Sequence, residues 1–237
     1  MRPEGPRGRA RPRRGRTASI GAVTAQEIAD LPYAAALRPH QGALAADGQY
    51  DSAHFDQLAL EDPDARNATF LECAFTQVSA QGGRLRRARF SDVWFRDVRL
   101  MAADLAQTSW VDVTFIGGVV AGVEAFGTLL RRAAFLGSKL DSVNFREASL
   151  TDVTFDNCLL RDVDFSGAKL TRTVFTESRL SRANFSKAIM EDVDLRGAEL
   201  DIIAGPDSLR GAIISPGQLT GIAPALAESL GIIVREQ

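Results

Sequence analysis

Few side chains in this 237-residue chain could take part in acid–base, nucleophilic or metal chemistry. The sequence has two histidines, His40 and His54, and two cysteines, Cys73 and Cys158. A metal site needs Cys and His residues at short regular spacing, and a serine triad needs a histidine base. The sequence after His54 supplies neither, and its glycine pairs lack the pattern of a phosphate-binding loop. We therefore expect a non-catalytic protein with no metal site and no cofactor.

Charged residues remain as candidates for function. The chain has 28 basic and 30 acidic residues, a net charge of −2. The charges are unevenly distributed along the chain, because residues 1–16 hold seven arginines and one acidic residue, Glu4. Residues 51–207 hold 24 acidic and 18 basic residues. The body of the protein is therefore mildly acidic and its N-terminal segment strongly basic.

A repeat of five residues must position these charges. Twelve of the 13 phenylalanines lie at residue numbers divisible by five, from Phe55 to Phe185. Every fifth position from 55 to 200 holds twelve Phe, twelve Leu, three Ala and one each of Met, Trp and Val. Two residues earlier the side chain is almost always small. The pattern is small, variable, large apolar, variable, variable.

A period of five excludes the two common regular structures. An α-helix turns about 100° per residue, so a stripe at this spacing would spread around the helix. A flat strand alternates its faces, so an odd period would place successive large residues on opposite sides. The chain must therefore turn a corner in each repeat, and the repeats must stack on one another. This predicts an all-β solenoid.

The repeat resembles the pentapeptide-repeat family, whose pattern is often written Ala-Asp/Asn-Leu-x-x. The matching segments include Ala168-Lys-Leu170, Ala183-Asn-Phe185 and Ala198-Glu-Leu200. The resemblance implies a right-handed quadrilateral β-helix with four repeats, or 20 residues, in each coil. It covers nearly two thirds of the chain and says far less about function than about fold.

The sequence supports a coil of 20 residues independently. At that spacing one side carries a ladder of large apolar residues: Phe55, Phe75, Phe95, Phe115, Phe135, Phe155, Phe175 and Leu195. Residues 51–200 make about 7.5 coils, and at a strand spacing of about 4.8 Å the rod would be about 36 Å long. Cys73 and Cys158 occupy small inward positions on different sides, four coils apart, so we expect no disulfide.

Four regions are expected along the chain. Residues 1–19 are a disordered tail, 20–50 an N-terminal helical cap segment, 51–214 the β-helix and 215–237 a C-terminal helical cap. Thr24-Ala-Gln-Glu27 is a capping box that opens a helical segment through about Leu37, interrupted at Pro32. Ser215 is the expected N-cap of the C-terminal helix, which Pro224 kinks or splits.

The C-terminal segment has two interpretations. Its candidate cap or dimer residues lie on an approximately helical stripe: Leu219, Ile222, Leu226 and Leu230. A solenoid end exposes unpaired strand edges and apolar side chains, so the segment serves as a lid. In DNA-mimicking members of the family this region also makes a dimer. Lid alone and lid plus homodimer both stay open.

The basic tail also has more than one interpretation. It is a solvated tail, an extension upstream of the true start of translation, or an arm that contacts nucleic acid or anionic lipid. Arg13-Arg14 is similar to a twin-arginine export signal, but no apolar region follows it and no stretch reaches transmembrane length. We therefore expect a cytoplasmic protein with no membrane association.

Two columns of charge emerge at a spacing of 20 residues. One alternates in sign after its first two members and predicts structural ion pairs: Asp92, Asp112, Arg132, Asp152, Arg172 and Asp192. The other has no positive charge after Arg84, and we name Asp104, Glu124 and Asp164 the acidic stripe. The quinolone-resistance members of the family resemble B-form DNA and occupy the DNA site of gyrase, so the stripe is a candidate gyrase-binding surface. Arginines clustered at residues 84–89 and the absence of projecting loops argue against that role.

Phe126 is the one phenylalanine outside the register and is expected to face outward near Leu129. It is either a scattered exposed residue or part of a protein-binding patch. We interpret the protein as a non-catalytic scaffold that presents a rod to a protein partner. The alternatives are a DNA-mimicking modulator of gyrase and a protein that contacts nucleic acid through its basic tail.

Overall fold

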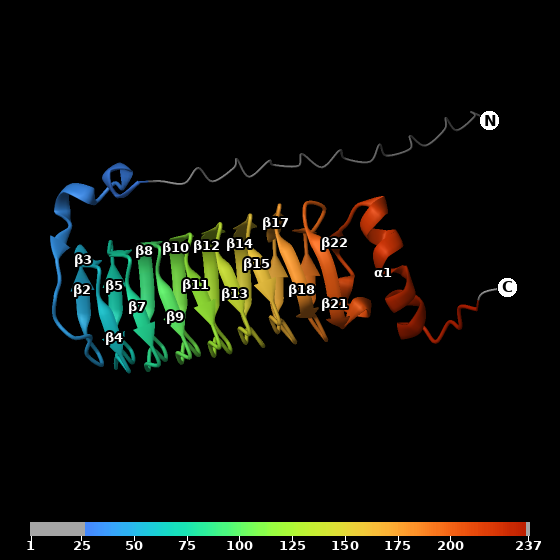
Figure 1. Ribbon diagram of the computed structural model, residues 1–237, viewed down its shortest axis with the longest axis horizontal. Helices are drawn as coiled ribbons and strands as arrows, with labels where there is room; N and C mark the ends of the chain where they lie inside the picture. Colours follow the sequence, from blue (N-terminus) through green and yellow to red (C-terminus); the bar gives the residue numbers. More distant parts are fainter. Residues whose placement is uncertain (1–26, 236–237) are drawn as a thin grey trace, which may run out of the picture.

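The computed structural model of this chain describes residues 27–235. These residues form a parallel β-solenoid closed at its C-terminal end by one α-helix (Figure 1). Each strand pairs with the strand one coil later, so that residues 20 apart lie side by side, as in Phe55 with Phe75 and Leu140 with Leu160. The expected all-β solenoid with 20-residue coils is confirmed.

The corners of the solenoid are set by a second column of the repeat. From Asp47 to Asp192, every fifth residue has a left-handed φ, between 45° and 68°. Six of these thirty corners are glycine and the other 24 carry a side chain. A left-handed residue reverses the side on which the next side chain points, so an odd repeat can keep all its large residues inside. Four corners in each coil make the cross-section quadrilateral.

Two adjoining sides of the solenoid form a 14-stranded sheet, whose longest strands run around the corner between those sides. Its strands are β1 (Arg38–Pro39), β2 (Gln49–Asp51), β3 (Ala53–Asp56), β5 (Thr69–Leu71), β6 (Ala74–Thr76), β8 (Arg89–Arg96), β10 (Ser109–Ile116), β12 (Leu129–Leu136), β14 (Ser149–Asp156), β16 (Lys169–Thr171), β17 (Val174–Thr176), β19 (Ile189–Glu191), β20 (Val193–Asp194) and β22 (Ala212–Ile213).

The third side is an 8-stranded sheet with one strand in each coil. Its strands are β4 (Ala59–Glu61), β7 (Ser79–Gln81), β9 (Arg99–Met101), β11 (Val119–Ala121), β13 (Lys139–Asp141), β15 (Leu159–Arg161), β18 (Arg179–Asn184) and β21 (Glu199–Ala204). The fourth side has isolated bridges between single residues, from Asp64 to Asn184, in place of strands.

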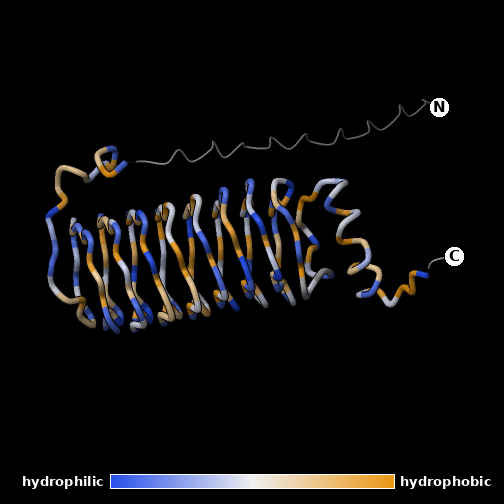
Figure 2. Tube along the Cα trace, in the orientation of Figure 1, coloured by the Kyte–Doolittle hydropathy of each residue, from blue (hydrophilic) through white to orange (hydrophobic). Residues whose placement is uncertain are grey.

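The core is built from the large and small apolar columns, and hydrophobic and hydrophilic residues alternate along every coil (Figure 2). Ring centroids in the phenylalanine ladder lie between 4.4 Å, for Phe55 and Phe75, and 5.8 Å, for Phe115 and Phe135. Two internal cavities in the core are about 20 and 30 Å³, far below the several hundred Å³ of a ligand site. The interior of the described residues is therefore filled by side chains.

The N-terminal segment is helical and is interrupted at Pro32, as the sequence predicts. It has two 3-10 helices, Ile28–Asp30 and Ala34–Ala36, separated at Pro32, which cannot supply the backbone N–H that a continuing helix needs. Glu27 N–H donates to Asp30, while Thr24 lies outside the described residues. The segment lies against the outer face of the early coils, where Leu31 packs with Ala74 and Trp94.

At the C-terminal end the left-handed corners stop after Asp192, and strand β21 pairs with β18 through a register shift. A third 3-10 helix, Pro206–Leu209, and the short strand β22 lead into helix α1 (Pro216–Ser229). The helix continues through Pro224 and is therefore not split there. Proline frees the carbonyl of Thr220, which is exposed and can bond to water. None of the described helices is long and apolar enough to cross a membrane.

Candidate functional site

The acidic stripe assembles as the sequence predicts. Each of its residues immediately precedes a buried inward residue on the fourth side of the coil: Leu105, Ala125 or Phe165. Parallel bridges join Arg84 to Asp104, Asp104 to Glu124, and onward at one-coil steps to Asp164. The stripe is therefore one continuous column along the rod, about 4.8 Å per step.

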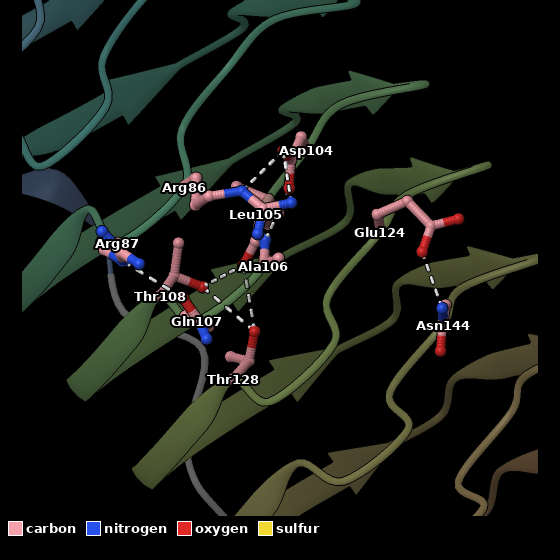
Figure 3. Close-up of polar contacts among 10 residues, drawn as sticks. All are labelled: Arg86, Arg87, Asp104, Leu105, Ala106, Gln107, Thr108, Glu124, Thr128 and Asn144. Atoms are coloured by element: carbon pink, nitrogen blue, oxygen red, sulfur yellow. Dashed lines mark hydrogen bonds and ion pairs between the residues drawn. The ribbon is translucent and has the colours of Figure 1, made fainter.

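Arginines neutralise the early part of this column. Arg86 donates from Nε to Asp104 Oδ2 at 3.1 Å, and Ala106 N–H donates to Asp104 Oδ1 at 3.0 Å (Figure 3). Two coils earlier in the column, Arg66 bonds to Asp64 at 2.8 Å and lowers the pKa of that carboxyl to about 2. Asp104 is thus one half of an ion pair, which weakens it as a stand-in for a phosphate.

The later part of the stripe keeps its charge. Glu124 is exposed, and it accepts from the Asn144 side-chain amide at 2.6 Å (Figure 3). Asp164 accepts the N–H of Ser166 at 2.9 Å. Both donors are neutral, so these bonds orient the carboxylates without cancelling their charge.

The alternating column at the corner between the two sides of the 14-stranded sheet is structural, as expected. Arg132 donates to Asp112 and Arg172 to Asp152, both from Nε at 2.6 Å, and these bonds lower the pKa of each aspartate. Burial and the nearby Asp112 raise the pKa of Asp92. No arginine occupies the same column position in a coil next to Asp92. The ion pairs join neighbouring coils at exposed corners, where solvent and salt screen them, so each adds little to stability.

Two more ion pairs of this kind were missed in the sequence. Arg161 bonds to Asp141 and Arg182 to Asp162, again 20 residues apart. The same mapping at 20-residue intervals would have found both pairs. These four residues lie at outward positions next to the 8-stranded sheet. Their charges are paired between neighbouring coils.

Phe126 faces outward as expected, and its side of the rod carries a basic and apolar corner. Phe126 is 36% exposed and Leu129, across the corner at Gly127, is 45% exposed. Arg146 follows Phe126 by one coil. Arg87, two coils earlier at the Gly127 corner, donates to Gln107 at 3.1 Å (Figure 3). We name Arg87, Phe126, Leu129 and Arg146 the Phe126 corner.

The predicted cap residues divide between two faces of helix α1. Ile222 is buried, and Leu226 lines a cavity with Leu209 and Ile214 at the end of the solenoid. Leu219 and Leu230 are 50% and 74% exposed. Ile222 and Leu226 therefore belong to the lid, and Leu219 and Leu230 are available to a partner.

The start of helix α1 also closes the last coil. Ser215 and Gln218 form the capping box, with Ser215 N–H donating to Gln218 Oε1 at 2.7 Å. The side-chain amide of Gln218 donates to the carbonyls of Leu195 and Ala198 at 2.5 and 2.6 Å. The expected N-cap is confirmed, and its glutamine satisfies carbonyls that the end of a solenoid leaves open.

The reactive side chains are buried separately. Cys73 and Cys158 are unpaired, and burial raises the pKa of both thiols to about 11. Within residues 27–235 no three His, Cys, Asp or Glu side chains come together as metal ligands. The arrangement of the described residues offers surfaces for binding.

Residues 128–203 match the family model described as a pentapeptide repeat region. These residues are a pentapeptide repeat region. A search of curated proteins found no match. Among solved structures, the pentapeptide repeats are similar to those of HetL from the cyanobacterium Nostoc sp. Strain PCC 7120, a protein involved in heterocyst differentiation regulation. HetL is 20% identical with a TM-score of 0.45, and the match covers 78% of this chain and 94% of HetL.

Two further structures of pentapeptide-repeat proteins are similar. Trypsin-treated QnrB1, a plasmid-mediated fluoroquinolone resistance protein, is 18% identical with a TM-score of 0.30, over 84% of this chain and all of that one. A protein of the Arabidopsis thaliana thylakoid lumen is 15% identical with a TM-score of 0.35, over 53% of this chain and 74% of that one.

Proposed function

We propose that this protein is a non-catalytic scaffold that binds a protein partner through the Phe126 corner. The observation that carries the proposal is the exposure of Phe126, the one phenylalanine outside the repeat register. Neighbouring apolar side chains ringed by arginine are typical of the centre of a binding surface. The corner suits a partner surface that is acidic around an apolar centre.

Binding should be lost when the apolar centre is charged. The test captures partners from an extract of the source cells with the intact protein, with Phe126→Asp plus Leu129→Asp, and with the control Leu159→Asp. Leu159 is 37% exposed on the 8-stranded sheet, so the control carries a comparable change on another side. Partners retained by the control and lost by the double variant support the proposal. The same partners on all three proteins would refute it, provided that melting temperatures agree.

The acidic stripe supports a second candidate function, a DNA mimic that modulates gyrase. Carboxylates stacked along a rod present repeated negative charge, as phosphates do. The charge retained by Glu124 and Asp164 favours this function, and the Arg86–Asp104 ion pair opposes it. A gyrase supercoiling assay with protein lacking residues 1–16 tests it without interference from the basic tail.

Inhibition of supercoiling that is weakened by Glu124→Lys plus Asp164→Lys would support the DNA mimic. Asp152→Lys, which changes the same charge in the structural column, is the matched control. No inhibition at micromolar protein would rule the function out. The third hypothesis, contact with nucleic acid through residues 1–16, lies outside the described residues and stays a prediction.

A further inference from the structure

The two ends of the 8-stranded sheet are closed differently. Its last strand, β21, contacts helix α1 at the C-terminal end of the rod. Its first strand, β4, lies at the opposite end and pairs with β7 alone (Figure 1). The chain before the first complete coil adds a strand only to the neighbouring side, where β1 pairs with β3. Among the described residues, strand β4 is therefore an open edge of the sheet.

The hydrogen bonds of the first two coils identify which backbone groups are open. Ser79 N–H donates to the carbonyl of Leu58 at 2.8 Å, and Asp62 N–H donates to a carbonyl of the next coil at 2.9 Å. The even-numbered residues here thus bond to the following coil. Backbone groups alternate in direction along a strand, so those of Ala59 and Glu61 point toward the end of the rod. No hydrogen bond between described residues uses these two N–H groups and two carbonyls.

The side chains of β4 indicate what an added strand would contact. Ala59 and Glu61 are exposed, and Leu60 between them is half-buried. Leu60 lines a small cavity at the end of the core together with Leu44. A residue of the added strand that faces inward would lie over Leu60, as Leu60 itself lies over Ala80 of the next coil. The central residue of the added strand should therefore be apolar.

Charge around the edge decides the occupant. Residues 38–62, which form this end of the rod, hold five acidic residues and one basic residue. Asp56, Glu61 and Asp62 are exposed around β4, and no ion pair of the described residues includes them. A second copy docked edge to edge would set these carboxylates against one another, and repulsion disfavours that pairing. Basic side chains would complement them.

We propose that β4 binds an extended segment of a partner protein by strand addition, and that this segment carries an apolar residue flanked by Lys or Arg. The backbone of the segment takes the hydrogen bonds that Ala59 and Glu61 leave open. Its apolar residue packs on Leu60, and its basic residues lie beside Glu61 and Asp62. The edge lies apart from the Phe126 corner, which is further along the rod and on other sides. A scaffold that binds at both places holds two partners on one rod.

Amide hydrogen exchange measured by NMR on the full-length protein tests the strand addition. The probe is the peptide acetyl-Gly-Arg-Val-Arg-Gly-amide. The amides of Ala59 and Glu61 should exchange quickly in the free protein, and saturating peptide should slow both by about ten-fold or more. The same peptide N-methylated at its valine keeps its charge but loses the central N–H. It should bind about ten-fold more weakly, which corresponds to the loss of roughly one hydrogen bond.

Two protein variants separate the backbone edge from its charge. Ala59→Pro removes an N–H that faces away from the sheet, a position where an edge strand tolerates proline, so it should keep the melting temperature and lose peptide binding. Glu61→Lys should weaken binding by about ten-fold, and the matched control Glu177→Lys, at an exposed corner of later coils, should leave it unchanged.

Three results would overturn the strand addition. The first is peptide binding that leaves the amides of Ala59 and Glu61 in fast exchange, because charge alone would then hold the peptide. The second is equal binding of the parent and the N-methylated peptides. The third is no binding of the parent peptide at millimolar concentration.

Discussion

At the scale of single residues, the corners show the strongest conflict between backbone and side chain. The left-handed region costs a residue with a Cβ about 1–2 kcal/mol, and Asn and Asp tolerate it better than Ala. Ala102 is the one corner alanine among residues 47–192, with φ 54° and an exposed side chain. Its methyl group adds strain without filling the core.

Ala102→Gly should therefore stabilise the protein. We expect the free energy of unfolding to rise by about 1 kcal/mol, because relief of the strained φ exceeds the entropy that glycine loses on folding. Urea unfolding followed by circular dichroism measures it. Ala121→Gly, at an ordinary strand position in the next coil, is the matched control and should lose about 0.5–1 kcal/mol. A loss of stability in both variants would show that the corner imposes no strain.

The phenylalanine ladder could be predicted residue by residue because one periodic pattern fixes both burial and register. The corners were also visible in principle, since every fifth residue from 47 to 192 is glycine or polar except Ala102. The pairing of Arg86 with Asp104 could not be found by counting in twenties, because the two residues are 18 apart. That hydrogen bond runs diagonally between two columns of the rod. Flexible side chains form it only after the coils have folded, so spacing in the sequence does not indicate it.

At the scale of elements, the two ends of the solenoid were less predictable than its middle. The N-terminal segment has no repeat that would indicate where it packs, and only the tertiary contact of Leu31 with Trp94 shows that it covers a side of the rod. Helix α1 was visible because Ser215, Pro216 and Gln218 form a local capping signal. The position of the helix against the last coil places Ile222 and Leu226 against the solenoid and leaves Leu219 and Leu230 exposed.

Gln218→Glu should loosen this end of the solenoid. The substituted carboxylate can still accept from Ser215 N–H but cannot donate to the carbonyls of Leu195 and Ala198. The Ala198 carbonyl then loses its donor, the Leu195 carbonyl keeps only the N–H of Ala198, and both face a negative charge, so we expect a loss of about 2 kcal/mol. Hydrogen exchange should rise in α1 and β22 before earlier coils, since each repeat contacts only its neighbours.

The control for this lid is the same change at an exposed corner, Gln77→Glu. It should alter the free energy of unfolding by no more than about 0.5 kcal/mol. Unchanged exchange in α1 and β22 of Gln218→Glu would show that the glutamine does not close the coil.

At the scale of the whole molecule, the rod leaves apolar residues uncovered at its C-terminal end. Leu219 lies on the helix and Leu230 at its C-terminal end, and the chain beyond is also exposed, with Ile232 at 57% and Ile233 at 77%. Thr220, Ala223 and Ala227 line a shallow depression with Ile232 on the same side. Exposed apolar groups concentrated at one end favour association through that end. We propose a homodimer in which α1 lies between two rods, with Ile222 and Leu226 of each helix facing the end of their own solenoid.

Leu219→Asp plus Leu230→Asp should separate the two chains. We expect light scattering to give twice the 25.6 kDa of one chain for the intact protein and 25.6 kDa for the double variant. Burying two aspartates between chains without partners costs several kcal/mol, which should dissociate the dimer. The double variant should keep its circular dichroism spectrum, because neither residue is buried against the solenoid. Leu159→Asp on the 8-stranded sheet should stay dimeric, and a monomeric intact protein would contradict the dimer and leave α1 as a lid alone.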